Sequence, residues 1–112
     1  MLFRSSKRAL ELGDETQKLM IANTIDRYLI NLGYKQLFGA QSFRNGPNNC
    51  HCLGQTEKKF SENLRVKICG RSLKDRISVL REVNRNNSLC EKILYCEKNL
   101  EAPPRGLFPG IW

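Results

Sequence analysis

The residues best suited to chemistry are three neighbours, Cys50, His51 and Cys52, which lie in a loop rich in glycine and asparagine. They place the only histidine of the chain between two thiols, and Cys69 could act as a further ligand. Zinc prefers four nitrogen or sulfur ligands in a tetrahedron, although its common loop spacing, Cys-x₂₋₄-Cys, is wider than the Cys-x-Cys found here. The sequence therefore offers a weak structural zinc site at these four residues. The alternative is ordinary loop cysteines, made redox-active if nearby positive charge lowers their pKa.

The cysteine count and the start of the chain bear on the compartment. Five cysteines are an odd number and no secretory signal is present, so we expect mostly free thiols, with Cys90 and Cys96 as half-buried apolar residues. This favours an intracellular protein, cytoplasmic or nuclear. The first ten residues hold three basic residues and no acid, which leaves a very short mitochondrial presequence as an alternative.

Catalysis is not indicated by the residue pattern. A nucleophilic cysteine or serine needs a base and an orienting group, and His51 is the one imidazole available. Its neighbours in sequence do not direct their side chains at it, and the carboxylates are expected mainly as helix caps or helix surface. We therefore predict a protein that is not an enzyme and that needs no cofactor, apart from the zinc considered above.

Positive charge is concentrated in the middle of the chain. The formal net charge is +8, and the stretch from Arg44 to Arg85 carries ten lysines or arginines against four carboxylates. Such a surplus favours an anionic partner, through Coulomb attraction and counterion release. The longest apolar run, Leu19 to Ala22, is far shorter than the roughly 20 residues needed to span a bilayer, so no transmembrane segment is expected.

Six of these basic residues are the best-placed phosphate contacts. On a helix, Lys74, Arg81 and Arg85 fall within about 40° of one another, beside an apolar stripe. Few aromatic residues lie among the basic ones, so the pattern predicts phosphate binding rather than stacking on bases. The alternative is an ordinary solvated face. The full predicted set is Arg65, Lys67, Arg71, Lys74, Arg81 and Arg85.

The end of the chain carries a second candidate interface. Residues 102–112 hold three prolines and two glycines, which rule out a continuous helix, together with a cluster of large apolar side chains. These side chains are costly to leave in water, so they should dock either on the protein itself or in the groove of a partner protein. The candidate partner-binding residues are Leu107, Phe108, Ile111 and Trp112.

The elements that position these residues begin with a long helix. Apolar residues such as Ile21, Ile25 and Leu29 recur at helical spacing, with Asp14 and Gln17 placed as a capping box and Gly33 suited to the position after the helix. We predict a helix over about residues 15–32. Its apolar surface is broad enough to serve either the core or self-association.

The centre of the chain is rich in loop residues. After the glycine-rich and asparagine-rich stretch, residues 64–69 alternate apolar and basic or polar side chains, which is typical of a half-buried strand. A single strand needs a partner, and we expect a short extended stretch near residues 37–43 to pair with it.

The last third predicts two helices. Two pairs of residues predict helix starts, Ser72 with Asp75 and Ser88 with Glu91. In each pair the serine hydroxyl would accept a hydrogen bond from a backbone amide of the first turn, and the acid would accept one from the backbone amide of the serine. Two helices joined by a turn at residues 84–87 would form a helical hairpin. A helix-turn-helix that reads DNA is disfavoured, because the second helix carries three acids against two lysines and would gain no net attraction to the backbone.

Together these features define the expected molecule. The fold class is α+β, mainly α, with one long N-terminal helix, a loop-rich centre with one or two short strands, a C-terminal helical hairpin and an extended aromatic tail. Residues 1–13 form a flexible basic arm, residues 14–101 a single small globular domain and residues 102–112 the tail. We expect a small basic subunit or adaptor that makes sequence-tolerant contact with RNA in an RNA–protein assembly. The alternative is a protein-interaction subunit that uses the first helix and the tail, with no nucleic-acid role.

Overall fold

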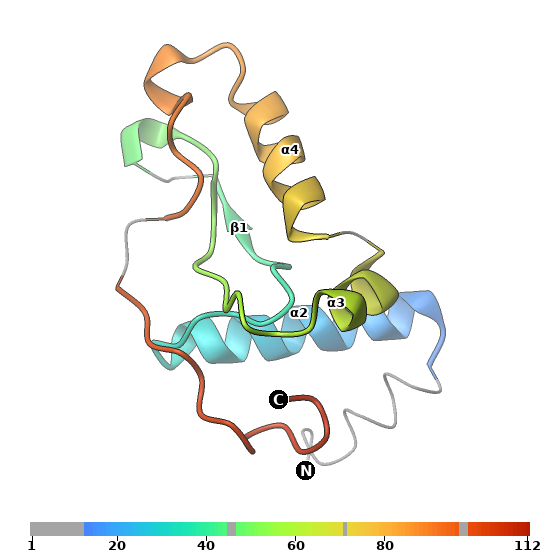
Figure 1. Ribbon diagram of the computed structural model, residues 1–112. Helices are drawn as coiled ribbons and strands as arrows, with labels where there is room; N and C mark the ends of the chain where they lie inside the picture. Colours follow the sequence, from blue (N-terminus) through green and yellow to red (C-terminus); the bar gives the residue numbers. More distant parts are fainter. Residues whose placement is uncertain (1–12, 45–46, 71, 97–98) are drawn as a thin grey trace.

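The computed structural model describes residues 13–44, 47–70, 72–96 and 99–112. These residues form a small, mainly helical α+β fold (Figure 1). Its helices are α2 (Glu15–Asn31), α3 (Glu62–Cys69) and α4 (Leu73–Val83), and its 3₁₀ turns are η1 (Pro47–Asn49) and η2 (Ser88–Cys90). Strands β1 (Ser42–Phe43) and β2 (Cys52–Leu53) pair antiparallel, with Ser42 opposite Leu53 and Phe43 opposite Cys52. Part of the predicted arm, residues 1–12, lies outside the described residues.

Helix α2 confirms the longest sequence prediction. The Asp14 side chain accepts a hydrogen bond of 2.8 Å from the Gln17 amide, as expected of an N-cap. The chain leaves the helix at Gly33, which has a φ of 87° that glycine adopts without steric cost. The buried side of the helix carries Ala22, Ile25 and Leu29.

The core lies where α2 meets α3 and the C-terminal tail. It is built from α2, the chain at residues 37–38, Phe60, the α3 residue Ile68 and the tail residue Phe108. The Phe38 and Phe60 rings meet edge to face at a centroid distance of 5.0 Å. Figure 1 shows the tail running along one side of α2, while α4 rises from the opposite side. Helix α4 therefore stands apart from the main core.

The prediction of a strand at residues 64–69 is wrong, because these residues form part of helix α3. The Ser61 hydroxyl caps this helix by accepting from the Leu64 amide at 3.2 Å, and Gly70 ends it with a φ of 69°. The buried residues, Arg65 and Ile68, are three apart and share one side of the helix. The predicted pairing with residues 37–43 is therefore also wrong, and β1 pairs with β2 instead.

The C-terminal helical hairpin is half correct. Helix α4 begins as predicted, since Ser72 and Asp75 form a reciprocal capping box. Among the described residues after Asn87 no second α-helix forms, since the 3₁₀ turn there stops at Cys90. The chain then runs beside β2, where the Leu53 amide donates to the Leu94 carbonyl at 2.8 Å and the Cys96 amide donates to the Leu53 carbonyl at 2.9 Å. In the described part of the chain, no helix is long and apolar enough to cross a membrane.

Candidate functional site

Helix α4 presents the predicted cations to solvent. Lys74 and Arg81 of α4 are exposed, and so is Arg85, which lies just beyond the end of the helix at Val83; we call these three residues the α4 basic face. The buried residue of the helix, Leu80, lies about 100° to 120° around the helix from Arg81 and Lys74. Arg85 makes an ion pair of 2.9 Å with Glu82, but both side chains are about two-thirds exposed, so this pair is weak and can be exchanged for another anion.

The other predicted phosphate contacts are placed differently. Lys67 is exposed on α3, whereas Arg71 lies outside the described residues. Arg65 is only 1 % exposed and its guanidinium is used inside the protein. It donates to the Leu37 carbonyl from Nε at 3.1 Å and from Nη2 at 2.7 Å, and it also pairs with Glu62. In this conformation Arg65 holds the fold together and does not face a phosphate backbone.

Three charged residues from three helices hold the chain at residues 37–40. The Asp26 carboxylate of α2 accepts from the amides of Leu37, Phe38 and Ala40 at 2.9, 3.0 and 2.9 Å. Arg65 of α3 binds the Leu37 carbonyl. Arg76 of α4 donates to the carbonyls of Gly39 and Ala40, at 3.0 and 3.2 Å. This arrangement ties the first half of α4 to the core.

Burial changes the acid–base behaviour of Asp26. Desolvation raises the pKa of its carboxyl from 3.8 to about 6, against the opposing effect of the backbone hydrogen bonds and of the Arg65 charge. Sequence patterns did not single out Asp26 or Arg76. Both form hydrogen bonds with a chain segment that is more than ten residues away, so no local sequence pattern indicates their roles.

The cysteine prediction requires the largest correction. Four of the five cysteines form two disulfides, Cys50–Cys90 and Cys52–Cys96, and we call this pair of bonds the cysteine clamp. The expectation of mostly free thiols is therefore wrong. Only Cys69 is free among the cysteines, and burial raises the pKa of its thiol to about 11, so it stays protonated at neutral pH.

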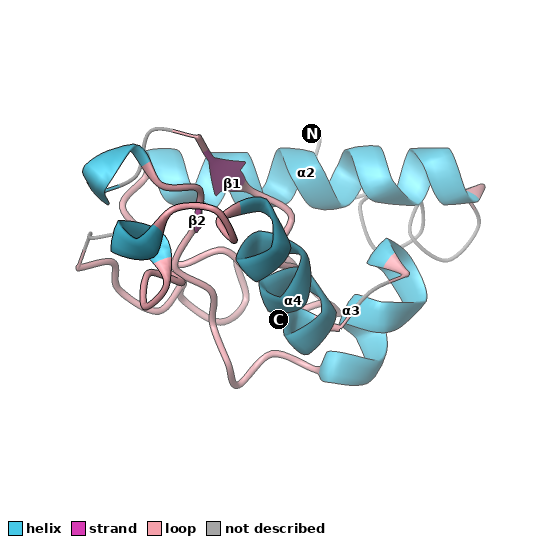
Figure 2. Ribbon diagram, turned by 90° about the horizontal axis from the view of Figure 1, so that it is seen from above, coloured by secondary structure: helices cyan, strands magenta, loops and turns pink. Residues whose placement is uncertain are grey.

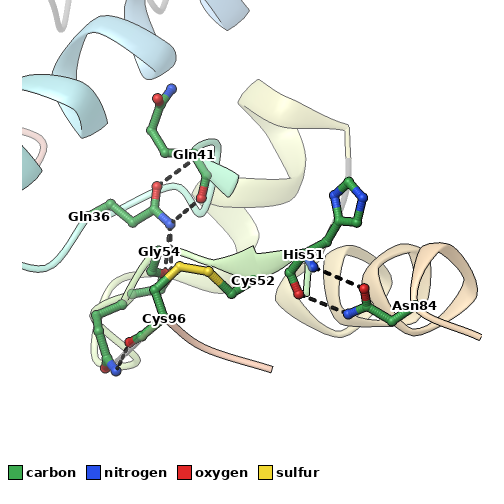
Figure 3. Close-up of a disulfide and its surroundings, with 9 residues drawn as sticks. Gln36, Gln41, His51, Cys52, Gly54, Asn84 and Cys96 are labelled. Atoms are coloured by element: carbon green, nitrogen blue, oxygen red, sulfur yellow. Dashed lines mark hydrogen bonds between the residues drawn. A yellow bond between two sulfur atoms is a disulfide. The ribbon is translucent and has the colours of Figure 1, made fainter. Parts of the chain in front are cut away.

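The residues of the weak zinc site do not come together around a common point. The sulfurs of Cys50 and Cys52 are each bonded to another sulfur, so they are not thiolate ligands in this state. Within the described ranges, no group of three or more histidine, cysteine or acidic residues could hold a metal ion. Figure 3 shows the His51 imidazole pointing away from the Cys52–Cys96 bond.

The chain around the clamp is held by amide side chains. The Asn84 side chain accepts from the His51 amide at 3.0 Å and donates to the His51 carbonyl at 2.8 Å (Figure 3). The Gln36 amide nitrogen donates to the Gly54 carbonyl at 2.8 Å and to the Gln41 carbonyl at 3.1 Å. These bonds fix β2 and its neighbours, and through Asn84 they hold the end of α4.

The candidate partner-binding residues of the tail are packed against the protein itself. Phe108 is completely buried, and Leu107, Ile111 and Trp112 pack around the same core. The Trp112 indole nitrogen donates to the Pro103 carbonyl at 2.9 Å, and the Arg105 guanidinium lies 4.0 Å from the centre of the indole ring. A partner could insert Phe108 only after the tail had undocked, whereas Leu107, Ile111 and Trp112 are half-buried and keep part of their surface exposed.

A cavity of about 430 Å³ lies between α2, the 38–40 segment and the start of α4. Its lining residues are Leu19, Asn23, Phe38, Gly39, Ala40, Cys69 and Arg76. The protonated Cys69 thiol is not activated as a nucleophile there, so the cavity does not by itself indicate a reaction.

Comparison of this chain with protein-family models, with curated proteins and with solved structures gave no match.

Proposed function

We propose that this chain is a small non-enzymatic binding domain whose α4 basic face contacts an anionic polymer, with RNA in an RNA–protein assembly as the partner. The observation that carries the proposal is the position of Lys74 and Arg81. Both are exposed, and because they are seven residues apart they share one flank of α4, beside the side that buries Leu80. Two cations one above the other along a helix can follow successive phosphates of a flexible strand.

The contact is expected to tolerate different sequences. Reading bases in a single strand needs exposed aromatic rings or donors fixed near the bases. Phe38, Phe60 and Phe108 are buried in the core, and the exposed Phe43 lies in β1 and not on the α4 basic face. Flexible lysine and arginine side chains bind phosphates by charge, which carries little sequence information.

The alternative is a protein-interaction subunit, and one surface favours it. Leu19 and Met20 on α2 are 44 % and 62 % exposed, which leaves apolar area available to a partner helix or sheet. The tail half of this alternative is less well supported, because Phe108 is already buried within the chain.

Charge reversal separates the two functions. The Lys74→Glu, Arg81→Glu double variant and the matched control Arg27→Glu, Lys59→Glu both lower the formal net charge from +8 to +4, and all four side chains are exposed. If the α4 basic face is the site, the first variant should bind a labelled single-stranded RNA at least about tenfold more weakly than the control, because it loses local phosphate contacts as well as net charge. Fluorescence anisotropy at fixed low salt measures this.

Equal weakening of both variants would contradict a site on α4 and would indicate only a general charge effect. Circular dichroism of each variant checks that the fold is kept. A heparin fragment serves as a second probe, because sulfate groups offer the same anionic chemistry as phosphates. Tighter binding of heparin than of RNA at equal charge would overturn RNA as the partner and would indicate a sulfated polysaccharide.

A further inference from the structure

The end of α4 and the chain that follows it bury little apolar surface. We call residues 77–96, from the last turns of α4 to Cys96, the distal segment. Its buried residues are Leu80, Asn84 and Cys90, and it contributes nothing to the main core cluster. Because burial of apolar surface is the dominant force that holds elements together, this segment needs another source of stability.

Two covalent bonds supply that stability. The cysteine clamp joins the distal segment to residues 50–53, across sequence separations of 40 and 44 residues. Both bonds connect the same two stretches of chain, so together they fix both the position and the direction of the distal segment along β2. The loops that they close are long, which is the case in which a crosslink restricts the unfolded chain most strongly.

In the described residues, the other contacts to the distal segment are mainly polar, including the Lys58 ammonium 5.9 Å from the centre of the Tyr95 ring. Asn84 makes its two hydrogen bonds to the His51 backbone, and Leu53 exchanges backbone bonds with Leu94 and Cys96. The side chain of Gln55 also donates to the Cys96 carbonyl at 3.1 Å. Each such bond replaces a bond to water and contributes little net stability.

We propose that the cysteine clamp is a redox-sensitive attachment. When it is oxidised, the distal segment is held against residues 50–53. When it is reduced, the segment detaches while the core formed by α2, α3 and the tail stays folded. Because Arg81 and Arg85 of the α4 basic face lie in this segment, reduction would also weaken polyanion binding, and this second consequence rests on the proposed function.

The reaction is thiol–disulfide exchange with a dithiol. One thiolate of the dithiol attacks a sulfur of the clamp and forms a mixed disulfide, and its second thiolate then resolves that bond. Each protein disulfide takes up two electrons and two protons to give two thiols, and the dithiol becomes a disulfide. Cys50 and Cys90 are 1 % and 2 % exposed, whereas Cys96 is partly exposed, so the Cys52–Cys96 bond should be reduced first.

The clamp also bears on the compartment. Disulfides persist where the surroundings are oxidising and are rare where glutathione and thioredoxin keep thiols reduced. The distal segment would therefore be attached in an oxidising compartment and released in the cytosol or nucleus.

The test is hydrogen exchange followed by mass spectrometry, with oxidised and fully reduced protein compared. A Cys69→Ser background removes the free thiol and prevents exchange between cysteines. Peptide mapping first establishes the two pairings, and alkylation confirms complete reduction. We expect amides of residues 77–96 to exchange at least about tenfold faster after reduction, while amides of α2 keep their protection.

Three results would overturn the proposal: different cysteine pairing in the oxidised protein, unchanged exchange of the distal segment after complete reduction, or equal loss of protection in the distal segment and α2. The last result would show that the clamp stabilises the whole fold and not the distal segment alone. The double variants Cys50→Ser, Cys90→Ser and Cys52→Ser, Cys96→Ser assign the effect to one bond or to both. Because hydrogen exchange is measured without RNA, failure of the oxidised protein to bind RNA would reject the proposed function. It would not affect the proposal that the clamp is a redox-sensitive attachment.

Discussion

At the scale of single residues, the fold depends on buried charged side chains that are hydrogen-bonded to the backbone. Asp26 and Arg65 bind opposite sides of the same peptide stretch, since Asp26 accepts from the Leu37 amide and Arg65 donates to the Leu37 carbonyl. Neither interaction with Leu37 could be predicted from the sequence, because Leu37 lies more than ten residues from both Asp26 and Arg65. Arg65 in particular shares its residue type with the exposed phosphate candidates, and only its position on the buried side of α3 separates it from them.

Removal of Arg65 should therefore damage stability first. Arg65→Ala leaves the carbonyls of Leu37 and Glu57 without the donor that they have in the native protein, and it empties a buried volume. We expect a loss of about 2 to 4 kcal/mol in the free energy of unfolding, measured by urea denaturation.

Lys67→Ala is the matched control, because Lys67 is exposed on the same helix. Its effect should stay within about 0.5 kcal/mol. Equal stability of the two variants would show that Arg65 does not have the buried structural role assigned to it.

Asp26 predicts a pH dependence of stability. Its pKa is about 6 in the folded chain against 3.8 ordinarily, so between these values the folded protein holds a proton that the unfolded chain has released. The contribution of Asp26 to stability is thus fully present below about pH 4 and is lost as the pH rises through about 6, by about 3 kcal/mol.

Asp26→Asn provides the reference, because its amide does not titrate in this range. Urea denaturation of both proteins at about pH 4 and about pH 7 isolates the Asp26 contribution from that of the other acids. We expect the stability of the wild type relative to the variant to fall between the two pH values. A constant difference would contradict the raised pKa.

At the scale of elements, the sequence correctly predicted the features that depend on interactions within a single helical turn. Asp14 and the Ser72–Asp75 pair correctly marked the starts of α2 and α4, because a cap satisfies amides within its own turn. The residues of α3 were assigned to a strand because Leu64, Val66 and Ile68 fit a period of two. In fact Leu64 and Ile68 are also four apart, as one side of a helix requires.

The capping box of α4 gives a prediction at this scale. Ser72→Ala removes the acceptor for the Asp75 amide and should cost about 1 kcal/mol, seen as faster hydrogen exchange in the first turns of α4. Ser78→Ala is the control, because that exposed hydroxyl bonds only to the Lys74 carbonyl of the same helix. Similar exchange in both variants would show that the cap does not hold the helix start.

At the scale of the whole molecule, the structure separates a core from an attached basic element. Figure 2, seen from above, shows α4 crossing over the middle of the molecule while α2 extends across its full width. The cysteines that fix this arrangement could not be paired from the sequence, since their partners lie 40 and 44 residues apart and nothing in the sequence says which of the five cysteines is free.

The most direct test of the central claim is the salt dependence of RNA binding by the oxidised protein. If the three residues of the α4 basic face each neutralise one phosphate, log affinity should fall linearly with log salt, with a slope of about −2.1 between about 50 and 200 mM. The Lys74→Glu, Arg81→Glu variant should show a slope flatter by about 1.4. Absence of binding at the lowest salt, or an unchanged slope in the variant, would contradict a polyanion-binding role for α4.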